Sequence, residues 1–336
     1  MQPDEIIRLL QGYQTTAIVR AGITLGMFAH LAGGAADATT VAQAIGADAR
    51  GTRILLDALT ALGLLRRQGQ TYGLTPAAET YLVPDRPTYL GDLIHLFAHE
   101  HFWEAFQRLP EAVRRGGTVL DQHAETPAHA FWEDFATYSA AIAGPAAETL
   151  AALLAPWAAA RPTLDLLDVA CGTGLYGFTL ARRYLQARVW ALDWPNVLPL
   201  TRSYAERLGV AERVQFIAGD MFTVPLGGPY DLIILSHVLH HFAEERATAL
   251  LHRCAAHLKP DGRLVIHDFI PNDQAEVTDP VPHLFSVVML VWTRAGEAHP
   301  LSRYQRMLST AGFALPAVHP LATQGSCFLL AERVPR

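Results

Sequence analysis

A glycine-rich segment in the middle of the chain has the spacing of a nucleotide-binding turn. Gly172, Gly174 and Gly177 follow a predicted strand over 164–170 and precede a predicted helix, in the pattern G-x-G-x-x-G. Glycines at these positions let the backbone approach a ligand closely. Asp193 ends the next predicted strand about twenty residues later, as in dinucleotide sites. The pattern alone fits a nicotinamide-dependent dehydrogenase, and it also fits a tight turn that binds nothing.

Three carboxylates favour a different ligand. Asp168, Asp193 and Asp220 stand at or just after the ends of three successive predicted strands, where they would repel a pyrophosphate. S-adenosylmethionine has no phosphate, and its ammonium, ribose hydroxyls and adenine amino group can all donate hydrogen bonds to carboxylates. The acids therefore favour S-adenosylmethionine over a dinucleotide.

Short apolar runs alternate with amphipathic helices from residue 161 onward, and this alternation predicts the fold that positions these residues. The strand-like runs are 164–170, 188–192, 214–218, 231–235, 264–267 and 326–334. Helical stretches lie around Phe178, Val197, Ala249 and Tyr304. Strands alternating with helices predict an α/β fold, with a mostly parallel sheet covered on both faces. Ligands bind beyond the carboxyl ends of such strands, which is where the three acids stand.

The first ninety residues predict a small helical module. Helical spacing covers 6–32, 41–45 after a possible cap by Thr39 and Thr40, and 49–65, and a polar hairpin follows over 66–74. Helix, turn, helix and hairpin in that order are typical of a winged helix, which suggests a DNA-binding regulator. Residues 1–90, however, contain seven arginines and seven acids, without the basic face that DNA requires. We therefore expect this module to contact another subunit.

The composition is that of a globular chain and excludes several classes of protein. The 336 residues are 51% hydrophobic, and 26 basic against 32 acidic residues give a formal net charge of -6. This charge argues against nucleic acid and anionic membranes as partners. No uninterrupted apolar stretch reaches the about 18 residues of a membrane span. Cys171, Cys254 and Cys327 are too far apart for a disulfide framework, which fits a reducing cytoplasm.

Taken together, the motifs resemble one family of enzymes. LLDVACGTG, ALDWPNV, VQFIAGDMF, DLIILSHVLHHF and LKPDGRLVIHDFIP are similar to segments of the small-molecule O-methyltransferases that include the caffeate, hydroxyindole and hydroxyneurosporene enzymes. The likeness covers nearly the whole chain. It implies a class I S-adenosylmethionine-dependent methyltransferase, with a Rossmann-like sheet, an antiparallel last strand and an N-terminal winged-helix dimerisation domain. The implied cofactor-binding residues are Asp168, Gly172, Gly174, Asp193, Asp220, Met221 and Ser236.

The resemblance also implies a general base. The family pattern W-x-L-H-D-W falls on 237–242, so its histidine is His240, with His237 in place of the Trp and His241 in place of the Asp. Asp268 matches the acid that orients this base. A neutral imidazole can take the proton of a phenol as the methyl group is transferred in line.

Two features around this base stay open in the sequence. The family's second flanking acid falls near Ala298, with Glu297 one place away. His237 and His241 are spaced i, i+4 and could share a metal with Asp268, but no H-E-x-x-H motif or cysteine ligand supports this, and we expect no metal.

Aromatic and apolar residues supply the candidates for binding the acceptor, although a core position is an equally good interpretation for several of them. They come from the aromatic-rich stretch 93–157, from the segment 237–242 that contains the predicted base, and from a predicted helix over 281–292. The candidates are Phe102, Trp103, Tyr138, His237, Phe285, Met289 and Trp292.

The sequence thus predicts three parts: a winged-helix dimerisation domain over 1–92, bridging helices that line the substrate pocket over 93–160, and an S-adenosylmethionine-binding catalytic domain over 161–336. We expect a cytoplasmic homodimer of secondary metabolism that methylates a hydroxyl of an apolar, aromatic or polycyclic small molecule. Methyl transfer to carbon, nitrogen or sulfur is the main alternative, ahead of the dehydrogenase and of a winged-helix regulator that senses the cofactor. The sequence does not name the acceptor.

Overall fold

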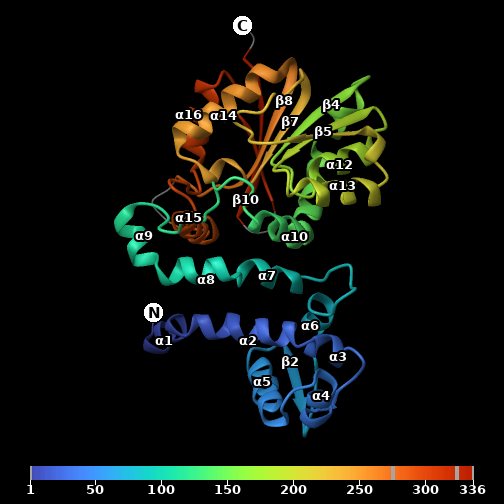
Figure 1. The fold of residues 1–336 in the computed structure, drawn as a ribbon, viewed down its shortest axis with the longest axis vertical. Helices are drawn as coiled ribbons and strands as arrows, with labels where there is room; N and C mark the ends of the chain where they lie inside the picture. The colour runs from blue at the N-terminus through green and yellow to red at the C-terminus, as the bar shows by residue number, and fades with distance from the viewer. Residues whose placement is uncertain (1, 274–276, 322–324, 335–336) are drawn as a thin grey trace. The chain divides into compact units, whose positions relative to one another are not determined.

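A computed structural model describes residues 2–273, 277–321 and 325–334. The chain divides into two compact units, Met1–Glu100 and His101–Arg336 (Figure 1). The separate bridging part over 93–160 stays a prediction.

The first unit consists of short helices and a small antiparallel sheet. Its elements are α1 (Pro3–Leu10), α2 (Gly12–Thr24), α3 (Met27–Leu31), β1 (Ala36–Asp37), α4 (Ala38–Ile45), α5 (Ala49–Ala61), β2 (Leu65–Gln68), β3 (Thr71–Leu74), α6 (Pro76–Tyr81), the 3-10 turn η1 (Gly91–Leu93) and α7 (Ile94–Phe97). The sheet has the order β1-β3-β2. Helices α4 and α5 followed by the β2–β3 hairpin have the element order that the sequence predicted, and the winged-helix assignment itself stays a prediction.

Two helix ends in this unit differ from the sequence prediction. The cap of α4 is Asp37, whose Oδ1 accepts hydrogen bonds from the amides of Thr39 and Thr40 at 2.9 and 3.0 Å. The two threonines therefore lie inside the helix and do not cap it, because the aspartate at the preceding position offers a charged acceptor. Helix α5 ends at Ala61 and not at residue 65, since Gly63 turns the chain with a positive φ of 77°.

The second unit alternates strands and helices. After α8 (Glu100–Gln107), which begins at the boundary between the units, come α9 (Leu109–Arg115), α10 (Phe131–Leu153), α11 (Ala155–Ala159), β4 (Leu164–Val169), α12 (Leu175–Arg183), β5 (Ala187–Asp193), α13 (Leu198–Arg207), η2 (Ala211–Arg213), β6 (Val214–Ala218), β7 (Tyr230–Ser236), η3 (Leu239–His241), α14 (Glu244–His257), β8 (Leu258–Phe269), α15 (Val281–Trp292), α16 (Leu301–Thr310), β9 (Ala317–Pro320) and β10 (Ser326–Glu332).

The strands form one seven-stranded sheet in the order β6-β5-β4-β7-β8-β10-β9. Strands β4 to β8 pair in parallel, whereas β10 pairs antiparallel with β8 and with β9. The mostly parallel sheet with an antiparallel last strand is therefore confirmed. The edge strand β9 was not predicted, because its four residues end in a proline and have no strand-like pattern.

The buried strand residues alternate between two core clusters, one on each face of the sheet. On β7, Ile233 and Leu235 belong to a cluster with α14 and α16, whereas Leu232 and Ile234 belong to a cluster with α10 and α12. Successive side chains of a strand point to opposite faces, so this division shows a sheet covered on both sides. Figure 1 shows α14 and α16 on one side of the sheet and α12 and α13 on the other. Such burial fixes the strand ends that carry the site.

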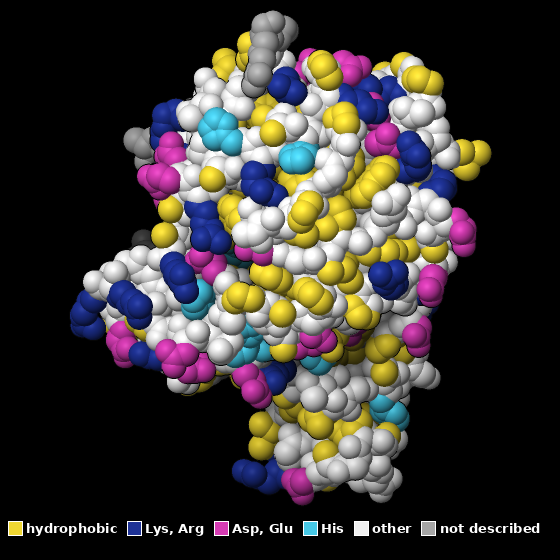
Figure 2. Space-filling view, turned by 45° about the horizontal axis from the view of Figure 1, so that its top comes forward, with side chains coloured by type: hydrophobic (Ala, Val, Ile, Leu, Met, Phe, Trp, Pro, Cys, Tyr) yellow, Lys and Arg dark blue, Asp and Glu magenta, His cyan; other side chains and the backbone are white. Residues whose placement is uncertain are grey.

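The described helices and the charged side chains on the surface agree with the expectations from the composition. None of the described helices has both the length and the apolar character that crossing a bilayer requires. On the face drawn in Figure 2, Lys and Arg side chains lie scattered among Asp and Glu side chains.

Candidate active site

The glycine-rich loop between β4 and α12 has a backbone that requires glycine. Gly172 and Gly174 have positive φ values of 55° and 77°. A side chain at Gly174 would also collide with the ring of Phe178. At Gly177 a Cβ would meet Val189 of the neighbouring strand at 2.9 Å. The loop therefore brings its amides close to the ends of the strands.

Two buried carboxylates accept hydrogen bonds from backbone amides in and near this loop. Asp168, near the end of β4, accepts a hydrogen bond from the Gly177 amide at 3.0 Å through Oδ2. Asp193, at the end of β5, accepts from the amides of Gly172 at 2.7 Å and Trp194 at 2.7 Å. Burial raises the pKa of Asp168 to about 7, with Asp193 adding to the shift, and raises the pKa of Asp193 to about 6. Among the described residues, neither carboxyl has a cationic side chain as an ion-pair partner.

The remaining predicted cofactor residues lie at neighbouring strand ends. The amide of Gly219 donates to the backbone oxygen of Asp193 at 3.0 Å, which sets Asp220 beside the end of β5. Asp220 Oδ1 in turn accepts from the Phe222 amide at 2.9 Å, and Met221 packs against the core between them. Ser236 ends β7, with Oγ 3.4 Å from His267 Nδ1. The sheet thus collects the predicted cofactor residues at its carboxyl edge.

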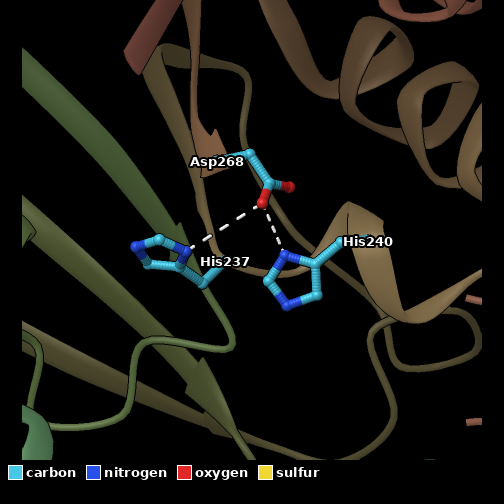
Figure 3. A group of neighbouring side chains, drawn as sticks. All are labelled: His237, His240 and Asp268. Atoms are coloured by element: carbon cyan, nitrogen blue, oxygen red, sulfur yellow. Dashed lines mark hydrogen bonds and ion pairs between the residues drawn. The ribbon is translucent and has the colours of Figure 1, made fainter. Parts of the chain in front are cut away.

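A histidine and an aspartate form a buried pair at the same edge (Figure 3). His240 lies on the 3-10 turn η3 after β7, and Asp268 lies near the end of the adjacent strand β8. His240 Nδ1 is 2.5 Å from Asp268 Oδ1, and both side chains are almost fully buried. The other ring nitrogen, Nε2, points away from the carboxylate in Figure 3. Nε2 is therefore the atom that can exchange a proton with a ligand.

Three donors surround the Asp268 carboxylate. Besides His240, the Phe269 amide donates to Oδ1 at 2.8 Å and the Tyr304 hydroxyl donates to Oδ2 at 2.6 Å. Burial alone would raise the pKa of Asp268, but the charge interaction and hydrogen bond with His240 and the Tyr304 hydroxyl hold it well below its usual range. Asp268 is therefore a carboxylate that can orient His240 and stabilise an imidazolium.

Two further histidines flank His240. His237 has a positive φ of 55°, and its Nδ1 lies 4.0 Å from Asp268 Oδ1. Burial lowers the pKa of His237 to about 4 and the pKa of His241 well below the usual value. Both imidazoles are thus neutral near pH 7, and they leave the ion-pairing position on Asp268 to His240.

The predicted acceptor residues divide into three groups. The Phe285 ring lies 4.7 Å from the His240 ring and 4.4 Å from the Phe269 ring, so Phe285 and His237 both border the base. Met289 and Trp292 lie in a buried aromatic cluster with Phe102, whose ring is 5.6 Å from that of Trp292. Trp103 and Tyr138 are half-buried on α8 and α10. The core interpretation thus fits Met289 and Trp292 better than Phe285.

His237, His240 and Asp268 could in principle hold a metal, since their ligand atoms lie within 4.8 Å of one another. The 2.5 Å between His240 Nδ1 and Asp268 Oδ1 is nevertheless a charge-assisted hydrogen-bond distance. Two ligands of a tetrahedral zinc would stand about 3.3 Å apart. The arrangement therefore favours proton transfer over metal binding.

The geometry agrees with the comparisons. Residues 149–314 match the O-methyltransferase domain model, and residues 7–84 match the O-methyltransferase dimerisation domain model. The 3-hydroxy-5-methyl-1-naphthoate 3-O-methyltransferase of Streptomyces sahachiroi is 30% identical, over 92% of this chain and 89% of the relative.

The chain belongs to the O-methyltransferase family.

Two solved structures extend the likeness to the fold. A protein of Nostoc punctiforme assigned as an O-methyltransferase has a TM-score of 0.93 and 30% identity, covering 98% of this chain and 99% of its own. Human N-acetylserotonin methyltransferase, solved with S-adenosylmethionine, has a TM-score of 0.78 and 24% identity, covering 99% of this chain and 97% of its own. At that identity the human structure supports the fold alone.

The strand-end residues of this O-methyltransferase fit S-adenosylmethionine. Asp168 and Asp193 are buried acceptors that form no ion pair with any side chain the structure describes, and the ligand offers an ammonium, a sulfonium and hydroxyl donors. A dinucleotide would place its pyrophosphate beside these same carboxylates, where the charges repel. These two buried carboxylates therefore favour the methyltransferase over the dehydrogenase alternative.

The sequence reasoning missed one residue around the base and left open which acid takes the second flanking position. Tyr304 occupies the second oxygen of Asp268, and its only sequence signal is its place in the apolar stripe of α16 with Met307 and Leu308. Glu297, the candidate for a second flanking acid, forms an ion pair with Arg303. Ala298, at the position expected from the family, is buried.

Proposed function

We propose that this chain is an S-adenosylmethionine-dependent O-methyltransferase that methylates a hydroxyl of an aromatic or polycyclic small molecule, with His240 as general base. The observation that supports the base is the buried hydrogen bond between His240 Nδ1 and Asp268. It leaves Nε2 as the free basic atom of a ring whose orientation and tautomer are fixed.

The chain's own residues have three roles in this proposal. S-adenosylmethionine, when bound, supplies a methyl group already activated for displacement. Asp193 and Asp220 would accept hydrogen bonds from its ribose and adenine, Asp168 would balance its positive charge, and Met221, Ser236 and the loop glycines would border it. His240 Nε2 would take the acceptor's hydroxyl proton as the O–C bond forms and the S–C bond to the methyl group breaks, with S-adenosylhomocysteine as the leaving group, and Asp268 would stabilise the resulting imidazolium.

An aromatic acceptor fits the surroundings of His240. The Phe285 ring lies 4.7 Å from the His240 ring, and the neutral imidazole of His237 lies 5.9 Å from it, so the base borders flat and uncharged groups. Flat aromatic molecules pack well on such rings. The Streptomyces sahachiroi relative is named for a hydroxynaphthoate, which is an acceptor of this shape.

We further propose a homodimer that works in the cytoplasm in secondary metabolism. The match to a dimerisation domain supports the pairing, and the apolar side chains that α1 and α2 expose would be covered by it: Ile6, Ile7, Leu9, Leu10 and Tyr13. Three unpaired buried cysteines suit a reducing compartment.

Replacement of His240 tests this function. Wild-type protein is incubated with S-adenosylmethionine and a panel of naphthols and hydroxyindoles, and mass spectrometry detects products that gain one methyl group. We expect His240→Ala to lower the turnover of the best acceptor about 10²- to 10⁴-fold, the usual share of a general base. Cofactor affinity by calorimetry should stay at the wild-type value.

The matched control is His252→Ala, which removes an exposed histidine from α14. Retained methyl transfer in His240→Ala would remove His240 as the base. Loss of cofactor binding in that variant would mean that His240 belongs to the cofactor site.

A further inference from the structure

The two oxygens of Asp268 have different partners. Oδ1 accepts from His240 Nδ1 and from the Phe269 amide, whereas Oδ2 accepts from the Tyr304 hydroxyl at 2.6 Å. All three side chains of this chain of hydrogen bonds are buried, and Asp268 and Tyr304 are fully excluded from solvent. Tyr304 therefore reaches the base through the carboxylate, without touching it.

Helix α16 holds Tyr304 in this position. Tyr304, Met307 and Leu308 form its buried face, in the same core cluster as α14. The Tyr304 ring also packs edge-on against the His299 ring, with 5.8 Å between centroids. A phenol enclosed in this way needs a partner for its hydroxyl, and Asp268 is that partner.

We infer that Tyr304 is a positioning residue for the general base, acting through Asp268. This inference rests on the proposed role of His240. In this role Tyr304 replaces the second acidic partner that the sequence had suggested near Ala298.

The hydrogen bond has two physical consequences. It fixes the rotation of the carboxylate so that Oδ1 faces His240 Nδ1, which keeps Nε2 free for the acceptor. It also draws charge from the carboxylate, so that Asp268 stabilises the imidazolium less than an isolated carboxylate would. Loss of the hydroxyl should loosen the imidazole and make it a stronger base.

Other titratable groups near Asp268 keep their charge across the pH range of the test. His237, from the segment after β7, stays neutral above its pKa of about 4, which burial lowers. Cys327, opposite Asp268 on β10, has a pKa that burial raises to about 12. Burial also lowers the pKa of His299, which precedes α16, and raises that of Tyr304 itself. Burial likewise lowers the pKa of His241 and of His267 on β8. Asp168 and Asp193 do titrate in this range, with pKa values of about 7 and about 6, so the profiles are compared at saturating S-adenosylmethionine. A difference between the wild-type and variant profiles then reports on the pair of His240 and Asp268.

Tyr304→Phe is the direct test, because it removes only the hydroxyl. We expect kcat to fall about 10-fold with little change in the KM of the acceptor or in cofactor affinity, and the midpoint of the acidic limb of kcat/KM to rise by roughly half to one pH unit. An unchanged midpoint and kcat would overturn the inference.

The matched control is Tyr230→Phe, which removes another buried tyrosine hydroxyl, the one that donates to the Leu226 backbone at the start of β7. This variant should lose stability but keep the wild-type midpoint. If both variants shift the midpoint equally, the effect of Tyr304 is merely structural.

Two further measurements keep the outcomes apart. In the His240→Ala background Tyr304→Phe should cause no additional loss of turnover, and an additional loss would place Tyr304 outside the path through the base. Should Tyr304→Phe fail to fold, proton NMR of the wild-type protein still tests the contact, since a slowly exchanging, downfield Tyr304 hydroxyl resonance is expected and its absence would refute it. Activity retained in His240→Ala would refute the proposed function, whereas loss there with a wild-type-like Tyr304→Phe would refute only this inference.

Discussion

Two sets of buried carboxylates at one edge of the sheet behave in opposite ways. Asp168 and Asp193, on β4 and β5, have raised pKa values of about 7 and about 6, mainly because of burial. Asp268, on β8, is equally buried, yet its pKa lies well below the usual range. All three carboxyls are buried at the same edge of the sheet, so the difference between their pKa values comes from their interaction partners.

The partners explain this contrast. Within the described residues, Asp168 and Asp193 accept hydrogen bonds from backbone amides alone, and Asp193 raises the pKa of Asp168 further. Asp268 receives an imidazole and a phenol from side chains placed for it. In the proposed function a cationic ligand completes the first pair, whereas Asp268 has its side-chain partners within the described part of the chain. A buried carboxylate without a balancing partner indicates a binding site, and one with its partners indicates preorganised chemistry.

The largest loss of activity should come from removing the charge of Asp268. Asp268→Asn keeps the side-chain shape but removes the charge that orients His240, and we expect kcat to fall on the order of 10²- to 10⁴-fold. The free enzyme should still bind S-adenosylmethionine with wild-type affinity in calorimetry.

The control for that change is Asp261→Asn, at an exposed position on the same strand that pairs with Arg161. It should leave kcat unchanged. An Asp268→Asn enzyme that turns over normally would show that the pair does not serve the reaction.

A change at Asp193 should have a smaller effect, and on cofactor affinity instead of turnover. Asp193→Asn weakens a charged acceptor, so S-adenosylmethionine affinity should fall about 10- to 100-fold, the range for one hydrogen bond to a charged group. Turnover at saturating cofactor should change little, which separates this variant from Asp268→Asn.

Asp165→Asn, at the opposite end of β4, controls for the loss of an acid from the same sheet. It should keep wild-type affinity. Equal affinities in Asp193→Asn and wild type would remove Asp193 from the cofactor site.

The smallest effect is a pH dependence of cofactor binding. The pKa values of about 7 and about 6 mean that Asp168 and Asp193 take up protons as the pH falls, and a protonated carboxyl cannot balance a cation. Affinity should therefore weaken roughly 10- to 20-fold from pH 8 to pH 6 and level off above pH 8. Calorimetry in buffers of different ionisation enthalpy should detect proton release on binding near pH 6.5. Pure pH independence would contradict the raised values.

The sequence predicted the fold well because its signals are local. Alternating strands and helices and the glycines after β4 follow from runs of a few residues, whereas the antiparallel direction of β10 came from the family resemblance. The errors are also local. Thr39 and Thr40 are residue types that favour a cap, but the Asp37 carboxylate precedes the helix and accepts their amides. Strand β9 has no signal of its own because its pairing with β10 provides the order that its residues lack.

The sequence predicts the candidate site residues that lie in recognisable motifs. The aspartates at the strand ends and His240 could be predicted as site candidates because a parallel sheet gathers its strand ends and because the family pattern marks the base. Tyr304 was missed because a phenol in an apolar helical stripe is usually a core residue, and only the packing of α16 brings it to Asp268. Glu297 was suggested by its position, but Arg303 competes for it.

The contrast between the carboxylates can be measured in the free protein. Aspartate side chains labelled with ¹³C at the carboxyl carbon, assigned with Asp168→Asn, Asp193→Asn and Asp268→Asn, report ionisation directly by NMR between pH 4.5 and pH 8.5. We expect Asp168 and Asp193 to titrate in this range, near the pKa values of about 7 and about 6, and Asp268 to stay ionised throughout. Ionised Asp168 and Asp193 at pH 4.5, or an Asp268 that takes up a proton within the range, would contradict the account.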